Sequence, residues 1–154
     1  MNKAFVKESD DARASNPLPD RPIPTGPNLV TPDGLDHLDK LIAKAEQDHT
    51  EALASGDVNE LARTERDRRY WSTRRATAQV AEQKRSGTTV EFGSTVRISR
   101  DGEEQTYRIV GADEADPADG ALSHNAPLAR ALLGKSKGDE IAVGGKSIEI
   151  VRIE

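Results

Sequence analysis

A glycine between two long helical patterns constrains the fold of this 154-residue chain most strongly. Upstream of Gly56, apolar residues recur at a helical interval over 32–55, and Pro32 suits a first helical turn. A second helix is expected from 58 to about 85. Gly56 ends the first helix because glycine readily adopts positive φ. A turn this short predicts that the two helices are antiparallel neighbours, forming a coiled-coil hairpin over 32–86.

The two predicted helices carry opposite charge. Residues 33–60 contain two lysines against eight acids, whereas residues 61–85 contain eight basic residues against three acids. An acidic helix beside a basic one gains favourable ion pairs, each of them weak at the surface. The arginines of the second helix therefore have a structural interpretation, as partners of the first helix, in addition to any functional one.

Proline shapes the residues that precede the hairpin. Over residues 1–31 it recurs in the run NPLPDRPIPTGPNLVT, which excludes a helix or a central strand there. We expect a Pro-rich extended or disordered leader. The same composition also fits a leader that lies along a neighbouring element.

After Gly87 the hydrophobic period changes from helical to alternating. Short β-branched runs follow one another in TVEFGSTVRIS, QTYRIVG, DEIAV and SIEIVRIE, and SRDGEEQ contains an Asp-Gly hairpin signal. The run APLARALLGK reads as one short helix with proline in its first turn and glycine at its end. The sequence thus predicts an α+β protein in which residues 87–154 form a small antiparallel sheet with a packed helix.

Composition excludes several classes of protein. The chain has no cysteine, so disulfides and thiolate metal sites are excluded, and its three histidines form no HExxH motif. A net charge of −5 argues against a surface that binds nucleic acid throughout. No secretory signal and no apolar run of about 20 residues occurs, so we expect a cytoplasmic location without membrane contact. His37 and His49 read as polar helix positions, and Trp71 reads as packing.

Asp57 and Glu60 stand at the start of the second predicted helix, in the stretch ASGDVNELAR. Asp at the N-cap with Glu three residues later is the spacing of a capping box, and both carboxylates suit the positive end of the helix dipole. Two acids at a protruding turn also suit Mg²⁺, which takes one or two carboxylates and leaves other positions to water or phosphate. Such a pair alone would not bind the ion tightly, so both interpretations stay open.

The stretch YRIVGADEADPADGALSHNAPLARALLGKSKGDEIAV resembles the C-terminal domain of the bacterial Gre transcript-cleavage factors. VTPDGLDHL and SGDVNE are similar to the start and the acidic tip of that family's N-terminal part, so the resemblance covers roughly residues 29–154. Ala126 stands where the family usually has serine. The family pattern corresponds here to 107–111, Asp113, Glu114, Asp116, Ser123, 127–130, 132–135, Gly138 and Asp139.

The resemblance implies an N-terminal antiparallel coiled coil and a C-terminal domain with an FKBP-like fold. It implies that the C-terminal domain docks on RNA polymerase and that the coiled coil enters the secondary channel. There Asp57 and Glu60 would help to hold a second Mg²⁺, supplied in the polymerase active centre, while the polymerase cleaves backtracked nascent RNA. The chain would then be a monomeric coactivator without a cofactor of its own, not an enzyme.

The residues after the acids depart from the family. Leu61, Ala62, Arg63 and Thr64 stand where the family commonly has Asn, Ala, Glu and an aromatic residue. This departure motivates an alternative, a non-cleaving regulator that occupies the same channel. A prolyl isomerase or chaperone-like module is a further alternative, which only the expected FKBP-like fold suggests.

Two further groups of residues are candidate contacts. Arginines of the second helix could contact the phosphates of the extruded RNA, and the alternative for them is interhelical pairing; these are Arg63, Arg66 and Arg68. A second group is expected to face the polymerase by resemblance, and it comprises Asp113, Glu114, Ser123, His124, Asn125 and Pro127.

Overall fold

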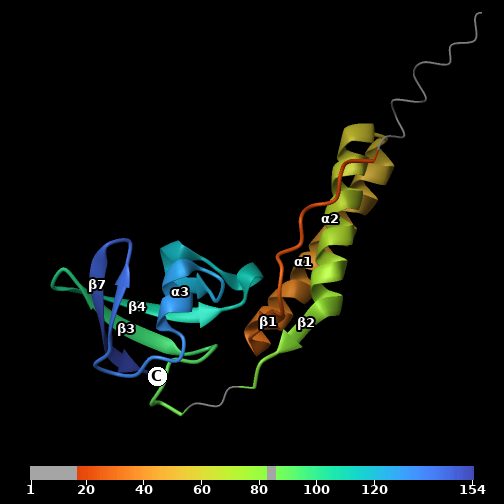
Figure 1. The fold of residues 1–154 in the computed structure, drawn as a ribbon. Coiled ribbons are helices and arrows are strands. Elements are labelled where there is room, and N and C mark those ends of the chain that lie inside the picture. The colour runs from red at the N-terminus through yellow and green to blue at the C-terminus, as the bar shows by residue number, and fades with distance from the viewer. Residues whose placement is uncertain (1–16, 83–85) are drawn as a thin grey trace, which may run out of the picture. The chain divides into compact units, whose positions relative to one another are not determined.

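The computed structural model describes residues 17–82 and 86–154, and Figure 1 shows its elements. The chain divides into two compact units. The first holds the described residues up to Thr25 together with Asp39–Ala76, and the second holds Gly26–Leu38 together with Thr77–Glu154. The second unit is called the C-terminal unit below. Three consecutive segments were expected from the sequence, whereas here residues 26–31 and the start of the first helix belong to the C-terminal unit.

Helices α1 (Pro32–Ser55) and α2 (Val58–Thr77) form the expected pair. Thr31 caps α1, since its Oγ1 accepts a hydrogen bond from the Gly34 N–H at 3.0 Å. At the other end, Gly56 has φ +70°, the left-handed conformation that ends the helix. The predicted start and end of α1 are therefore confirmed.

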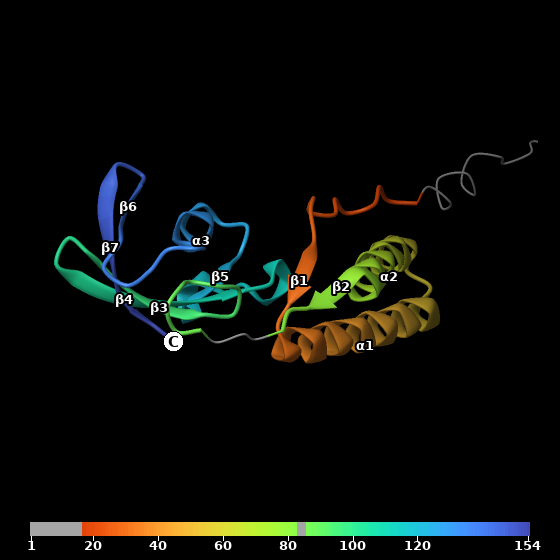
Figure 2. The ribbon, with the colours of Figure 1, turned by 60° about the horizontal axis from the view of Figure 1, so that its bottom comes forward.

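The second helix ends earlier than the sequence predicted. α2 stops at Thr77, and Ala78–Val80 form strand β2, which pairs in parallel with β1 (Asn28–Val30). Figure 2 shows the two strands side by side. The prediction of helix to about 85 was wrong for 78–82, because pairing with β1 offers this backbone other hydrogen-bond partners. The rest of that prediction, 83–85, lies outside the described residues.

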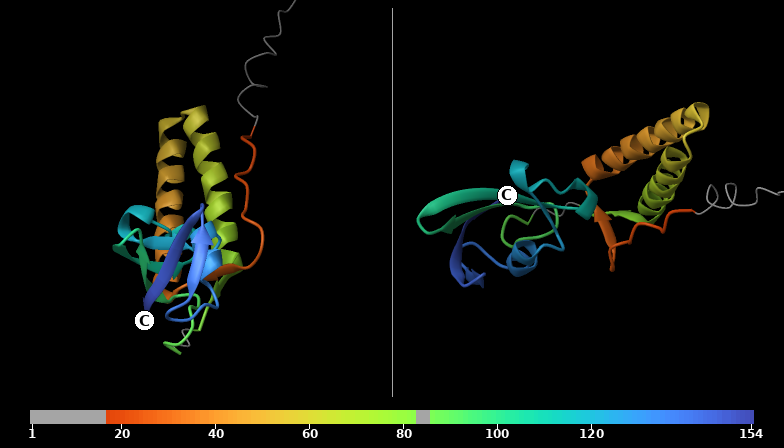
Figure 3. Two further views of the ribbon diagram at one scale, coloured as in Figure 1. Left: turned by 60° about the vertical axis from the view of Figure 1, so that its left-hand side comes forward. Right: turned by 90° about the horizontal axis from the view of Figure 1, so that it is seen from above.

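Strand β1 lies within the segment expected to be extended or disordered. Residues 28–30 are extended there and form a regular strand. Preceding it, residues 17–25, here called the strap, contact α2 through side chains of Asp20 and Arg21. Figure 3 shows the strap passing along the helix pair. For the described part of the leader, the alternative of lying along a neighbouring element is the one observed.

Polar contacts cross between the helices. Arg68 Nε lies 3.2 Å from Glu46 Oε1, and Arg75 Nε lies 2.6 Å from Asp39 Oδ1. Partner numbers rise along α2 as they fall along α1, so the helices are antiparallel. These ion pairs confirm the predicted pairing of an acidic helix with a basic one. None of the helices among the described residues has the length and apolarity needed to cross a bilayer.

The C-terminal unit contains a five-stranded sheet in the order β5-β4-β3-β7-β6. Its strands are β3 (Thr95–Arg100), β4 (Glu103–Val110), β5 (Ala121–Ser123), β6 (Glu140–Val143) and β7 (Lys146–Ile153). The α+β class is confirmed, but the sheet is mixed, because β5 pairs in parallel with β4 while the other pairs are antiparallel.

Asp101 and Gly102 make the predicted turn between β3 and β4. Both have positive φ, 54° and 80°, which matches the two-residue hairpin turn that Asp-Gly favours. The predicted short helix is α3 (Pro127–Leu132).

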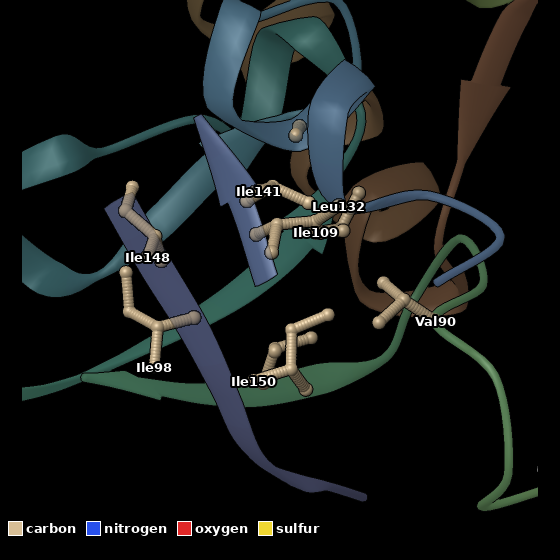
Figure 4. Packing of buried hydrophobic residues seen from close by; sticks show 9 residues of the cluster. Val90, Ile98, Ile109, Leu132, Ile141, Ile148 and Ile150 are labelled. Carbon is tan, nitrogen blue, oxygen red and sulfur yellow. The ribbon is translucent and has the colours of Figure 1, made fainter. Parts of the chain in front are cut away.

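The core of this unit is aliphatic. Side chains from β3, β4, β6 and β7 form one buried cluster with Ala129 and Leu132 of α3. Figure 4 shows Leu132 close to Ile109 and Ile141 of the sheet. The buried members are Val90, Val96, Ile98, Ile109, Ala129, Leu132, Ile141, Ile148 and Ile150.

Candidate functional site

Asp57 caps α2. Its Oδ1 accepts hydrogen bonds from the backbone N–H of Asn59 at 2.9 Å and of Glu60 at 3.2 Å. These are two of the donors that an α-helix leaves unpaired at its N-terminus, so the carboxylate is fixed by the backbone it caps. The capping role predicted for Asp57 is confirmed.

Glu60 does not complete the capping box. Ser55 Oγ accepts the hydrogen bond from the Asp57 N–H at 3.2 Å, the donor that a capping-box glutamate would take. The Glu60 carboxylate instead pairs with Arg63, whose Nη2 lies 2.7 Å from its Oε2. Hydrogen bonding and charge from Arg63 lower the pKa of Glu60 below its ordinary value.

The two carboxylates are exposed and lie one helical turn apart. An ionised carboxylate offers about four lone-pair positions, so the bonds described above leave oxygen positions for another ligand. Within residues 17–82 and 86–154, no three or more carboxylate or imidazole groups are arranged as a metal site. The pair could therefore supply one or two ligands to a hard cation whose remaining ligands come from elsewhere.

Apolar side chains flank the turn. Leu53, at the end of α1, is 59% exposed and Val58, at the start of α2, is 45% exposed. Sequence reasoning concentrated on the acids and did not single out these two residues. The signal was available, because both are apolar positions next to a glycine turn.

The three candidate RNA-contacting arginines all have acidic partners. Besides Glu60, Arg63 pairs with Asp67 at 3.4 Å, and Arg66 pairs with that same Asp67 at 3.4 Å. Arg68 pairs with Glu65 at 3.0 Å, in addition to the interhelical pair described above. Interhelical pairing, the structural alternative, thus holds for Arg68, whereas the pairs of Arg63 and Arg66 lie within α2. The RNA contact itself stays a prediction for all three.

Glu114, expected to face the polymerase, makes contacts within its own unit. It ends the 3₁₀ helix η1 (Ala112–Glu114), and its Oε2 accepts hydrogen bonds from the N–H groups of Thr31 at 3.1 Å and of Gly111 at 3.0 Å. The Thr31 hydroxyl bonds the other carboxylate oxygen. Glu114 therefore ties the residue that caps α1 to the C-terminal module. Asp113 precedes it in η1 and is half-buried.

The other candidates lie where β5 leads into α3. The His124 N–H donates to the Val110 carbonyl at 2.9 Å, and its ring meets Phe92 edge-on at 5.6 Å between centroids. Ser123 Oγ accepts from the Asn125 N–H at 3.3 Å. Asn125 and Pro127, which begins α3, are exposed. The structure thus brings these four residues together on the short segment that runs from the end of β5 to the start of α3.

His49 has a role that sequence reasoning missed. Its Nδ1 lies 3.1 Å from the Oγ1 of buried Thr64, and its Nε2 lies 3.4 Å from Glu65 Oε2. One imidazole therefore bridges α1 to two positions of α2. The sequence predicted only a polar helix position for His49 and indicated no partner, because a threonine is a weak sequence signal for burial.

Comparison with known proteins shows which family the chain resembles. A family model described as "Transcription elongation factor, GreA/GreB, C-term" matches residues 84–154. The chain is 38% identical over 139 residues to the transcription elongation factor GreA of Vibrio cholerae serotype O1, and this match covers 78% of the chain and 88% of that protein. The chain belongs to the GreA/GreB family of transcription elongation factors. The resemblance inferred from the sequence is confirmed.

Other known proteins are similar to the chain over shorter lengths or at lower identity. GreA of Methylobacterium sp. (strain 4-46) is 51% identical over 76 residues, which are 46% of this chain and 48% of that protein. The GreA factor homolog 1 (Gfh1) protein of Thermus thermophilus has a TM-score of 0.41 at 21% identity, covering 84% of this chain and 99% of that chain. GreA/GreB from Nitrosomonas europaea has a TM-score of 0.40 at 23% identity, with 81% and 97% covered.

Proposed function

We propose that this GreA/GreB-family chain binds RNA polymerase through the secondary channel and stimulates Mg²⁺-dependent cleavage of backtracked nascent RNA. The observation that carries the proposal is the exposed pair of carboxylates, Asp57 and Glu60, on one turn of the helical hairpin. The chain acts as a coactivator, since the polymerase supplies the RNA, the first metal ion and the active centre.

The chemistry follows from the needs of two-metal phosphoryl hydrolysis. A second Mg²⁺ in the polymerase centre would stabilise charge on the attacking and leaving oxygens. Asp57 and Glu60 contribute anionic ligands for it, so that the ion is held by both partners. Capping supports this role, because the hydrogen bonds that Asp57 accepts hold its carboxylate in place before the polymerase binds. Less conformational entropy of that side chain is then lost when the metal ion is bound.

Arg63 adds a proposed RNA contact next to the two carboxylates. It holds the Glu60 carboxylate at 2.7 Å, and its guanidinium is also suited to bind an RNA phosphate. When RNA enters, Arg63 can exchange Glu60 for phosphate, which leaves the carboxylate available to the metal. Arg66 and Arg68, further along α2, are the other proposed phosphate contacts.

The C-terminal module provides the proposed docking surface. Asn125 and Pro127 are exposed on the ordered loop before and at the start of α3, and His124 is fixed there by its contact with Phe92. Contacts that hold a loop in place reduce the conformational entropy that it loses when it binds a partner. Glu114 is the least suited of the candidates, because its carboxylate already bonds Thr31 and Gly111.

A non-cleaving channel regulator is the second candidate function. The observation that favours it is the Glu60–Arg63 ion pair, because an arginine that keeps hold of Glu60 would deny it to the metal. Such a factor would occupy the channel and change pausing or initiation without shortening the RNA.

Substitutions that preserve capping separate these possibilities. Asn caps helices about as well as Asp, so Asp57→Asn removes the charge and keeps the helix start. In halted, backtracked elongation complexes with Mg²⁺, we expect the wild-type chain to accelerate RNA shortening. Asp57→Asn and Glu60→Gln should lower that acceleration by about a hundredfold, as loss of a key electrostatic group typically does. Product length is read on a denaturing gel.

Glu51→Gln is the matched control, because Glu51 is also an exposed acid of the hairpin and pairs with Gln47. It should cleave like the wild type, and all variants should bind polymerase in a pull-down. Unimpaired cleavage by an Asp57→Asn, Glu60→Gln double variant would remove the metal role. Binding without any RNA shortening by the wild-type chain would support the non-cleaving regulator.

A further inference from the structure

The strap places a cation on an aromatic surface of α2. The Arg21 guanidinium carbon lies 3.9 Å from the centroid of the Tyr70 ring and 5.2 Å from that of Trp71. The two rings meet edge to face at 4.8 Å. Arg21 also pairs with Asp67 at 3.4 Å. A flat, delocalised cation over an aromatic face is a favourable arrangement.

The neighbouring strap residue covers a positive charge. Asp20 Oδ1 lies 2.8 Å from Arg69 Nε, at a pair whose side chains are 76% and 39% exposed. The strap thus presents a flat group to a ring and, one residue away, an anion to an arginine. Both contacts are made by side chains that water still reaches, so they can be exchanged for contacts with another partner.

A cavity of about 360 Å³ lies between the strap and α2. Asp20, Arg21, Arg69 and Tyr70 line it together with Ile23, which is 42% exposed. The Ile23 side chain is therefore only partly covered where the strap contacts α2, and the cavity between them stays open to solvent.

We propose that the strap occupies, within the same chain, a binding face for single-stranded RNA formed by Arg69, Tyr70 and Trp71. The guanidinium of Arg21 stands where a base would stack, and the carboxylate of Asp20 stands where a phosphate would pair. The strap is then an internal competitor of RNA. The inference deepens the RNA contact of the proposed function, and it is tested without polymerase or cleavage.

The composition of α2 supports RNA as the competing partner. The helix carries six arginines against three acids, and it holds two of the five aromatic residues of the chain. Single-stranded nucleic acid binds to surfaces that combine arginine with stacking rings, because every base has a π face and every nucleotide a phosphate. Because the chain as a whole carries a net charge of −5, RNA binding would depend on the local excess of arginine on α2.

A charge-neutral double variant tests the competition. Asp20→Asn with Arg21→Gln removes both strap contacts and leaves the net charge unchanged. Fluorescence anisotropy with a labelled single-stranded RNA of about 12 nucleotides, at about 50 mM salt, measures binding to the full chain. We expect the double variant to bind about tenfold more tightly than the wild type, equivalent to about 1.4 kcal/mol. Trp71, the single tryptophan, should shift its emission to longer wavelength as the strap leaves.

Further variants assign the gain to the proposed face. Adding Tyr70→Leu to the double variant should return the affinity to the wild-type value or below, with helicity checked by circular dichroism. Arg69→Gln in the same background should lower the slope of log affinity against log salt by about one. A control pair, Asp101→Asn with Lys146→Gln, removes an exposed 2.7 Å ion pair of the C-terminal module and should leave RNA binding unchanged.

Several results would overturn the proposal. They are equal RNA affinity of the wild type and the double variant, an unchanged Trp71 emission, or tight binding that survives Tyr70→Leu. Loss of cleavage stimulation in elongation complexes bears on the proposed function alone, because anisotropy and emission are read from the isolated chain.

Discussion

Asp57 and Glu60 are neighbours on one helical turn, yet different forces hold their carboxylates. The Asp57 side chain could be assigned from sequence, because an N-cap bonds backbone groups that are always present two and three residues later. The bonding partner of the Glu60 side chain could not be assigned from sequence. Ser55 satisfies the donor that Glu60 would have taken, and Arg63, three residues along α2, offers a charged partner instead. That choice depends on rotamers, which spacing does not encode.

The Glu60–Arg63 pair predicts a measurable change in titration. Arg63 lowers the pKa of Glu60, so Arg63→Gln should raise that pKa towards its ordinary value. Because the folded-state pKa is depressed, the pair stabilises the fold above the unfolded-state pKa and ceases to do so as pH falls through the folded value. An NMR titration of the Glu60 side-chain carboxyl carbon measures the shift.

Asp101 is the internal reference for that titration. Lys146 lowers its pKa by a similar hydrogen bond, and neither group is near Arg63 in the sequence. The pKa of Asp101 should therefore stay the same in Arg63→Gln. If the Glu60 pKa also stayed the same, the ion pair would not exist in solution, and the proposed exchange of Glu60 for phosphate would lose its basis.

At the scale of elements, the helix starts were predictable, whereas the C-terminal end of α2 and the short strands were not. Thr31, Pro32 and Gly56 are local signals, so they marked α1. The stop of α2 at Thr77 has no glycine or proline, because it results from pairing with β1, far away in the sequence. The sequence did not predict strand β5 for the same reason. Three residues are too few to show an alternating pattern, and β5 is a strand because it pairs with β4.

The start of α1 gives a prediction that opposes helix propensity. Ala in place of Gly normally stabilises a helix interior by about 0.5–1 kcal/mol. A Cβ at Gly34, however, would collide with the Glu114 carboxylate, which bonds Thr31 and Gly111. Gly34→Ala should therefore lower the free energy of unfolding by about 1–3 kcal/mol, because Glu114 must leave its donors. Thermal and urea unfolding measure it.

A double-mutant cycle identifies the cause. In a Glu114→Ala background the obstacle is absent, so Gly34→Ala should become neutral or stabilising there. Equal destabilisation by Gly34→Ala in both backgrounds would mean that the carboxylate is not the reason for glycine at this position.

At the scale of the whole molecule, the two units are stabilised differently. Among its described residues, the first unit buries the apolar side chains of Ala45 and Ala52, and the two helices are joined by ion pairs and by His49. The C-terminal unit has the isoleucine-rich core. Composition indicated this contrast, because 34% hydrophobic and 32% charged residues do not suit one large core. The sequence did not show which residues pair across the interface between α1 and α2, because that pairing depends on side-chain geometry.

The core predicts where truncation costs most. Ile109 is fully buried on β4, so Ile109→Ala should lower the free energy of unfolding by about 2–5 kcal/mol through lost burial and an unfilled cavity. Leu53→Ala is the control, since Leu53 is 59% exposed and its truncation should change stability by less than about 0.5 kcal/mol. Urea denaturation followed by far-UV circular dichroism compares them. Similar midpoints for both variants would contradict this distribution of stability.

The parallel pairing of β1 with β2 has a consequence for how the hairpin can be exchanged. Ala81 N–H donates to the Val30 carbonyl at 3.1 Å, and Asn28 Nδ2 lies 3.3 Å from Thr77 Oγ1. The points where the chain enters and leaves the two helices are thus fastened beside each other. A segment with adjacent, fixed ends can be cut out and replaced by one of another length. Residues 39–76, the part of the helix pair outside the C-terminal unit, therefore form a natural cassette for grafting hairpins from relatives onto an unchanged C-terminal unit.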